Sequence, residues 1–133
     1  MYRYQPEIII GPIPGSGGSL RLPRYVGKSK ALEMILTGDR INAKEAQMYG
    51  LVSAIHPVDN LIDEAMKIAE RIGTHSKVSC QLAKEAVNAA YETTLNHGIL
   101  FERRLFHATF ASNDRKEGMS AFIEKRKPKF TDS

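Results

Sequence analysis

Hydrophobic residues recur at helical spacing along most of the chain. The clearest case begins after Asn60, where the apolar positions fall on one helix face and stop at Gly73: Leu61, Ala65, Ile68, Ala69 and Ile72. The same spacing predicts a helix from about Ser76 and another from about Thr94. The second half of the chain is therefore predicted to be almost entirely α-helical.

Two helix starts carry the sequence signal of a cap. Asn42 precedes Glu45 by three residues, which is the spacing of a capping box. Asp114 and Glu117 repeat this spacing and predict the start of the last helix, which Pro128 ends. The chain is thus expected to contain a short helix after Asn42 and a final helix after Asp114.

The first third of the chain has a different pattern. The three isoleucines at residues 8–10 predict a short, buried, extended segment. Residues 11–19 contain two prolines and four glycines and predict a loop. A helix follows, with Ala31 and Met34 on its apolar face and Gly38 at its end, and residues 51–55 alternate weakly as in a strand. With so little sheet, the helices must pack on each other, on a partner or on a preceding half of the fold.

Composition and charge restrict the function classes. The chain has 133 residues, 42% hydrophobic and 26% charged, which is typical of a soluble globular protein, and no apolar run approaches the roughly 20 residues of a membrane span. No targeting segment is recognisable at the N-terminus. Cys80 is the only cysteine and the four histidines do not cluster, so we expect neither a disulfide nor a metal site. The net charge of +4 includes a basic tail, residues 125–129, but a nucleic-acid interface would need interleaved aromatic residues.

Two features of the N-terminal segment could carry chemistry. Glu7 stands directly before the isoleucines, and a carboxylate held against apolar side chains suits general acid–base work. The alternative is an ordinary surface glutamate. Gly15 belongs to a glycine-rich turn before a helix, where backbone N–H groups can bind a water or a carbonyl oxygen. The alternative there is a tight connection without a ligand.

Four stretches together resemble the crotonase (enoyl-CoA hydratase/isomerase) superfamily. They are residues 5–22 (QPEIIIGPIPGSGGSLRL), 36–52, 83–88 and 114–126. Within the superfamily, the chain is most similar to the C-terminal half of the mitochondrial short-chain enoyl-CoA hydratases. The resemblance implies an α/β fold with a ββα spiral core. Residues 1–57 would supply the end of that core and residues 58–133 a helical oligomerisation region, so this chain itself should be mostly α-helical.

The resemblance also implies an activity and site residues. The family adds water to 2-trans-enoyl-CoA thioesters in fatty-acid β-oxidation. Glu7 matches the second of its two catalytic glutamates, and Gly15 matches the position whose N–H orients the water. Phe106 and Lys125 lie where the family binds the coenzyme A nucleotide. No separate cofactor is expected, because coenzyme A is part of the substrate. A trimer or dimer of trimers and a mitochondrial matrix location are implied as well.

The resemblance begins abruptly at Gln5. The other glutamate and both oxyanion-hole donors belong to sequence upstream, so residues 1–4 are expected to be foreign to the fold and the chain to be a truncated, poorly active copy. Other crotonase reactions remain open: isomerisation, hydration of methylglutaconyl-CoA and acyl-CoA hydrolysis. So does a non-catalytic role as an interaction module.

Overall fold

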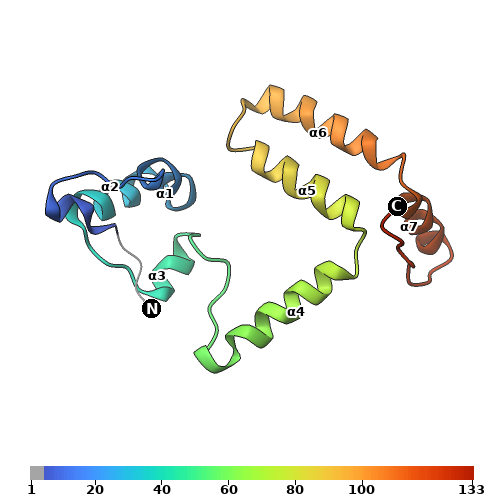
Figure 1. The fold of residues 1–133 in the computed structure, drawn as a ribbon, viewed down its shortest axis with the longest axis horizontal. Coiled ribbons are helices and arrows are strands. Elements are labelled where there is room, and N and C mark those ends of the chain that lie inside the picture. Colours follow the sequence, from blue (N-terminus) through green and yellow to red (C-terminus); the bar gives the residue numbers. More distant parts are fainter. Residues whose placement is uncertain (1–4) are drawn as a thin grey trace. The chain divides into compact units, whose positions relative to one another are not determined.

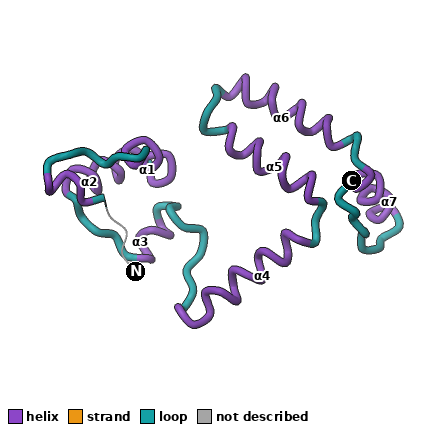
Figure 2. The backbone as a smooth tube through the Cα atoms, viewed as in Figure 1, coloured by secondary structure: helices purple, strands orange, loops and turns teal. Residues whose placement is uncertain are grey.

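A computed structural model describes residues 5–133, which form helices, turns and loops without a β-strand (Figure 2). The predominance of helix confirms the expectation for this chain. The chain divides into two compact units, Met1–Asp59 and Asn60–Ser133. None of the helices in the described range combines the length and hydropathy that crossing a bilayer requires.

Within the first unit, residues 5–57 form a 3-10 helix and three α-helices around a small apolar core (Figure 1). The helices are η1 (Pro6–Ile10), α1 (Gly18–Val26), α2 (Lys28–Thr37) and α3 (Ala43–Met48). Helices α1 and α2 pack on each other, and η1 packs on α2. The buried core comprises Leu22, Val26, Ala31, Met34, Ile41 and Ala46.

Local signals explain where these helices begin and end. Gly38 ends α2 in the left-handed conformation (φ 70°), and its N–H donates to the Met34 carbonyl at 3.0 Å. Asn42 caps α3: its side chain accepts from the Glu45 N–H at 3.0 Å, and the Glu45 carboxylate accepts from the Asn42 N–H at 2.8 Å. The predicted capping box is confirmed.

Two predicted extended segments are wrong. Residues 8–10 belong to the 3-10 helix η1, and Ile9 and Ile10 are 68% and 81% exposed. Pro6 at the helix start favours helical φ, and three apolar residues give no periodicity to separate strand from helix. Residues 51–55 are not a strand. The N–H groups of Leu51 and Val52 both donate to the Ala46 carbonyl, at 2.8 and 3.3 Å, so the chain turns back onto α3.

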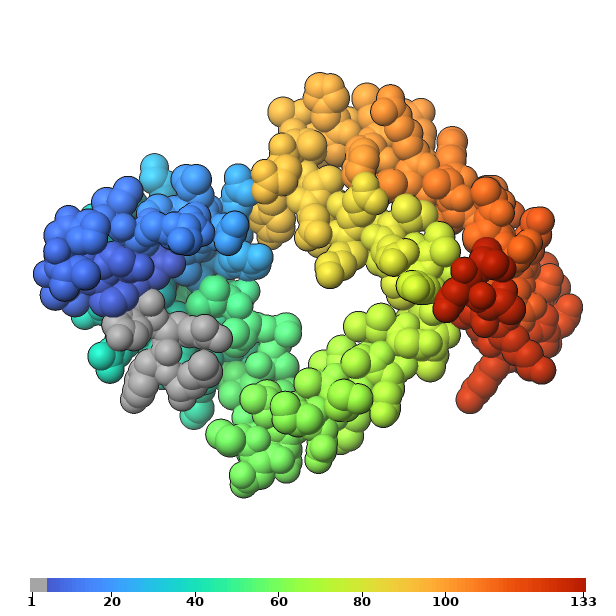
Figure 3. Space-filling view, in the orientation of Figure 1, coloured from blue at the N-terminus to red at the C-terminus, as the bar shows by residue number. Residues whose placement is uncertain are grey.

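The second unit is built from four α-helices after a short 3-10 turn, η2 (Val58–Asn60). They are α4 (Leu61–Gly73), α5 (Lys77–Ala89), α6 (Leu95–Thr109) and α7 (Asn113–Ile123). The starts predicted near Ser76 and Thr94 are confirmed, because these residues are the N-caps of α5 and α6. Helices α5 and α6 lie antiparallel (Figure 1). They pack on each other, and their atoms are in contact in the space-filling view (Figure 3).

Helix α4 has the predicted amphipathic face but leaves it open. Leu61, Ile68 and Ile72 lie on that face and are 49%, 50% and 52% exposed. No other helix makes a substantial contact with α4 in the described chain. A helix with this apolar stripe ordinarily covers a core, so α4 presents an unsatisfied packing surface.

The predicted cap of the last helix is wrong. Ser112, not Asp114, is the N-cap of α7, and its hydroxyl oxygen accepts from the Arg115 N–H at 3.1 Å. Asp114 lies one residue into the helix and is only 1% exposed. Asp114 and Glu117 bind the C-terminal tail instead. That contact joins residues 12 to 17 positions apart, which the local spacing could not predict.

Candidate functional site

Glu7 lies in η1 and is half-buried. One oxygen of its carboxylate, Oε2, is enclosed and makes no hydrogen bond within the described residues. Most buried polar atoms in proteins are hydrogen-bonded. An enclosed acceptor that the surrounding protein leaves unsatisfied suits a group that receives or gives a proton to a bound molecule.

The glycine-rich loop after η1 folds into the start of α1. Gly17 adopts a left-handed conformation (φ 81°) as the N-cap, and its carbonyl accepts from the Arg21 N–H at 2.8 Å. The Ser19 hydroxyl donates to the Pro14 carbonyl at 2.8 Å and ties the loop to the first turn of the helix. Gly15 is exposed within this loop, and its carbonyl accepts from the Gly18 N–H at 2.9 Å.

A cleft of about 390 Å³ opens beside this loop within the first unit. Its lining residues are Gln5, Gly15, Ser16, Gly18, Arg21, Leu22, Tyr25 and Leu51. The Gln5 side chain packs so closely on Gly18 that a Cβ there would lie 2.6 Å from Nε2, and Gln5 Oε1 is enclosed without a partner in the described chain. The structure thus places Gly15 in the cleft. Glu7 lies two residues from the lining residue Gln5 but does not line the cleft itself.

Phe106 lies on α6 and is 59% exposed. Its ring packs edge-to-face on Phe110 with centroids 5.3 Å apart, and the Arg115 guanidinium lies 3.8 Å above the Phe110 ring centroid. Phe106 also borders a groove of about 200 Å³ between α5 and α6, together with Leu82 and Leu105. An exposed ring held by its neighbours is suited to stacking against a flat ligand group.

Lys125 follows Glu124, the C-cap of α7, and is exposed. It adopts a left-handed conformation (φ 55°), and the next residue, Arg126, donates its N–H to the Ala121 carbonyl at 3.0 Å. Glycine is the usual residue at such a helix end, because a side chain in this conformation is strained. Phe106 and Lys125 are each positioned by local contacts, and no contact joins the two side chains within the described residues.

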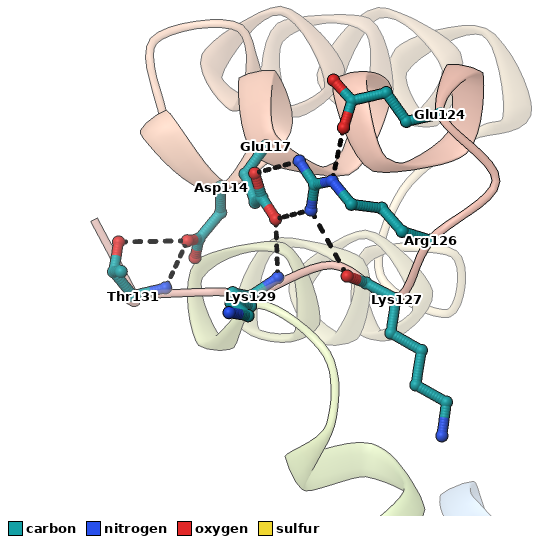
Figure 4. Close-up of polar contacts among 7 residues, drawn as sticks. All are labelled: Asp114, Glu117, Glu124, Arg126, Lys127, Lys129 and Thr131. Carbon is teal, nitrogen blue, oxygen red and sulfur yellow. Dashed lines mark hydrogen bonds and ion pairs between the residues drawn. The ribbon is translucent and has the colours of Figure 1, made fainter.

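The tail after Lys125 is anchored to α7 by two carboxylates (Figure 4). Glu117 accepts from both terminal nitrogens of Arg126, at 2.5 and 3.0 Å, and from the Lys129 N–H at 2.7 Å. Asp114 Oδ1 accepts from the Thr131 N–H at 2.7 Å. Helix residues three apart are about as far from each other as alternate residues of an extended chain, so the two anchors match the N–H groups of two alternate tail residues, Lys129 and Thr131.

These contacts lower the pKa of both acids. The Arg126 guanidinium, followed by the Lys129 N–H, lowers the pKa of Glu117 to about 2. The nearby Ser76 hydroxyl, followed by the backbone N–H groups of Thr131 and Asp132, holds the pKa of Asp114 below its usual range. Both acids are therefore ionised near neutral pH, and their role in this structure is to hold the tail.

Sequence reasoning identified neither the Gln5 contribution to the cleft nor the two acids that anchor the tail. The sequence shows only the i, i+3 spacing of Asp114 and Glu117, and this spacing predicts a helix cap rather than an anchor for the tail. No group of three His, Cys, Asp or Glu side chains among residues 5–133 is arranged to hold a metal ion.

Comparison with known proteins decides the family. The sequence model of the enoyl-CoA hydratase/isomerase family matches residues 3–133. The chain belongs to this family. Enoyl-CoA hydratase subunit I from Geobacillus kaustophilus superposes with a TM-score of 0.95 at 42% identity, over 99% of this chain and 51% of that one. The predicted crotonase-like fold is thereby confirmed for the part of the fold that this chain represents.

Curated relatives of the family are closer in sequence. The mitochondrial enoyl-CoA hydratase of Pongo abelii is 59% identical over 96% of this chain and 44% of its own length. The probable mitochondrial enoyl-CoA hydratase of Dictyostelium discoideum is 57% identical over 93% of this chain and 45% of its own length. The 2,3-dehydroadipyl-CoA hydratase of Escherichia coli is 45% identical over 94% of this chain and 49% of its own length. The chain spans about half the length of the curated relatives it matches.

Proposed function

We propose that this chain is the C-terminal part of an enoyl-CoA hydratase and that Glu7 is one of its two catalytic carboxylates. The observation that carries the proposal is the enclosed Glu7 oxygen, which has no hydrogen-bond partner among the described residues, in the helix that precedes the glycine-rich loop of a chain 59% identical to a mitochondrial hydratase. Hydration adds a water oxygen to the β-carbon and a proton to the α-carbon of the thioester. Glu7 would exchange a proton with that water, and the Gly15 N–H would orient it.

The resemblance to the family implies that the remaining groups of the site belong to a segment upstream of Gln5. They are the other glutamate and the two N–H donors that stabilise the thioester oxygen as it gains charge. The substrate is proposed to be a 2-enoyl-CoA thioester, with Phe106 and Lys125 contacting its nucleotide. Phe106 offers an exposed ring and Lys125 an exposed ammonium group, which suit an adenine and a phosphate respectively.

Crotonyl-CoA hydration, followed by loss of the enoyl absorbance, tests this proposal. The chain is assayed alone and after co-expression with the N-terminal half of the mitochondrial relative. We expect turnover in the co-expressed protein, and its loss in Glu7→Gln with the affinity for crotonyl-CoA retained. Glu85→Gln, an exposed carboxylate on α5, is the matched control and should keep full turnover. Turnover that is unaffected by Glu7→Gln would refute the assignment.

We also propose that the chain assembles into a trimer or a dimer of trimers. The open apolar face of α4 supports this, because such a face is stabilised by burial against another surface. Analytical ultracentrifugation of the wild type and of Ile68→Lys gives the test. Loss of the oligomer in the variant is expected, and an unchanged mass would contradict α4 as the interface.

A mitochondrial location is proposed from the names of the Pongo abelii and Dictyostelium discoideum relatives. Fractionation of cells with an antibody to this chain checks it. Recovery outside mitochondria would contradict the proposal.

A further inference from the structure

The place of Glu7 depends on how η1 sits on the end of α2. Helix η1 contacts α2 within the first unit. The bond that closes its C-terminal end is long: the Gly11 N–H donates to the Ile8 carbonyl at 3.3 Å. The Glu7 side chain adds no hydrogen bond through Oε2. The apolar packing of the neighbouring isoleucines on α2 therefore contributes to the position of the carboxylate.

Two of these isoleucines, Ile8 and Ile9, pack against Gly38 at the end of α2. A Cβ at Gly38 would lie 2.8 Å from Ile9 Cδ1 and 2.9 Å from Ile9 Cγ1, and 3.5 Å from Ile8 Cγ2. Carbon atoms that are not bonded to each other sit about 3.5–4.0 Å apart at best. Any side chain at residue 38 would therefore push η1 outward by roughly 1 Å, unless Ile9 left its rotamer.

Gly38 has two separable properties. Its left-handed φ of 70° ends α2, a requirement that other glycines in this chain share. The missing Cβ, by contrast, admits a side chain of η1, the element that carries Glu7. Gly50 has nearly the same φ, 78°, but a Cβ there would meet only the Tyr25 carbonyl oxygen at an ordinary 3.5 Å. Gly50 is thus a natural control for the backbone requirement alone.

We infer that Gly38 is a positioning residue for Glu7: the absence of its side chain lets Ile8 and Ile9 seat η1 against α2 and fixes where the carboxylate lies. The inference rests on the proposed function, because it assigns Gly38 a role through the catalytic use of Glu7. A misplacement of about 1 Å at a reacting group costs on the order of 10²-fold in rate. Gly38→Ala should then lower kcat by about that factor and leave KM nearly unchanged.

The test is a compensation experiment in the co-expressed hydratase. Gly38→Ala is compared with Gly38→Ala combined with Ile9→Ala, which removes both atoms that the new Cβ would meet. Ile9→Ala alone loses part of the packing that seats η1, but Ile9 is 68% exposed, so kcat should fall less in this variant than in Gly38→Ala. We expect kcat to fall in the single variant, to recover at least tenfold in the double variant, and to be unchanged in Gly50→Ala.

Backbone NMR shifts of residues 7–11, measured on the chain itself, separate this inference from the proposed function. Gly38→Ala should move these shifts relative to wild type, the double variant should have shifts close to those of Ile9→Ala alone, and Gly50→Ala should leave the wild-type shifts in place. Unmoved shifts together with unchanged kcat, or a kcat loss that Ile9→Ala fails to relieve, would overturn the inference. The shifts could move and recover as expected while Glu7→Gln leaves turnover unchanged. That result would support the seating of η1 by Gly38 and refute the catalytic role of Glu7.

Discussion

Met34 offers the strongest stability prediction for the unit that carries Glu7. It is 2% exposed, is among the largest fully buried side chains, and lies in the cluster formed by α1, α2 and α3. Its carbonyl also accepts the N–H of Gly38. Met34→Ala deletes three heavy atoms from this core. Methionine-to-alanine changes in well-packed cores cost about 2–5 kcal/mol in the free energy of unfolding, because a cavity remains.

The size of the unit makes this loss severe. At about 0.05–0.15 kcal/mol per residue, a unit of 59 residues has roughly 3–9 kcal/mol of stability. Met34→Ala should therefore remove from about a quarter to all of it. The core cluster contains no residue of the second unit, so the loss should be confined to residues 5–59.

Urea denaturation combined with hydrogen exchange and mass spectrometry measures this effect. We expect faster exchange in peptides from α1 and α2 and unchanged exchange in peptides from α5 and α6. Met48→Ala is the matched control: Met48 is 70% exposed, and its truncation should change stability by no more than about 0.5 kcal/mol. Equal losses in the two variants, or exchange that rises equally in both units, would refute the reasoning.

Three further predictions concern polar contacts. Asn42→Ala should destabilise α3 by about 1 kcal/mol in urea denaturation, and an unchanged midpoint would contradict the cap. Glu117→Gln should lower stability at pH 7. Because the pKa of Glu117 falls from an ordinary 4.5 to about 2, its contribution is present above pH 4.5 and is lost as the pH falls toward 2, where variant and wild type should converge. Glu124 accepts from the Arg126 side chain, and it is not one of the two acids that bind backbone N–H groups of the tail. Glu124→Gln should therefore lower stability less than Glu117→Gln at every pH. Asp114→Ala should speed amide exchange at Thr131, and an unchanged rate would remove Asp114 as an anchor.

The sequence predicted the features that depend on near neighbours. The helix after Asn60, the helix starts near Ser76 and Thr94, and the capping box of Asn42 and Glu45 all arise from residues within a few positions of each other. Periodicity and capping operate over that range, so local sequence is sufficient to predict these elements without knowledge of tertiary contacts.

The errors arose where distant residues decide the structure. Asp114 has the local pattern of a cap, but its partner is Thr131, seventeen residues later. The three isoleucines of η1 suggested a buried strand, but Ile8 and Ile9 lie against Gly38, at the end of another helix. Periodicity cannot identify either partner. The roles of Glu7, Gly15, Phe106 and Lys125 came from family resemblance and stay predictions.

The tail anchors have a consequence for how this segment can vary. Glu117 and Asp114 grip peptide N–H groups at residues 129 and 131, and every amino acid except proline supplies the same donor. The contacts at residues 129 and 131 therefore depend on spacing, because one inserted or deleted residue between them moves the second donor out of reach. The contact between Glu117 and Arg126 depends instead on the guanidinium group. Natural variants of this segment should keep its spacing and Arg126 while the other side chains vary in charge and size.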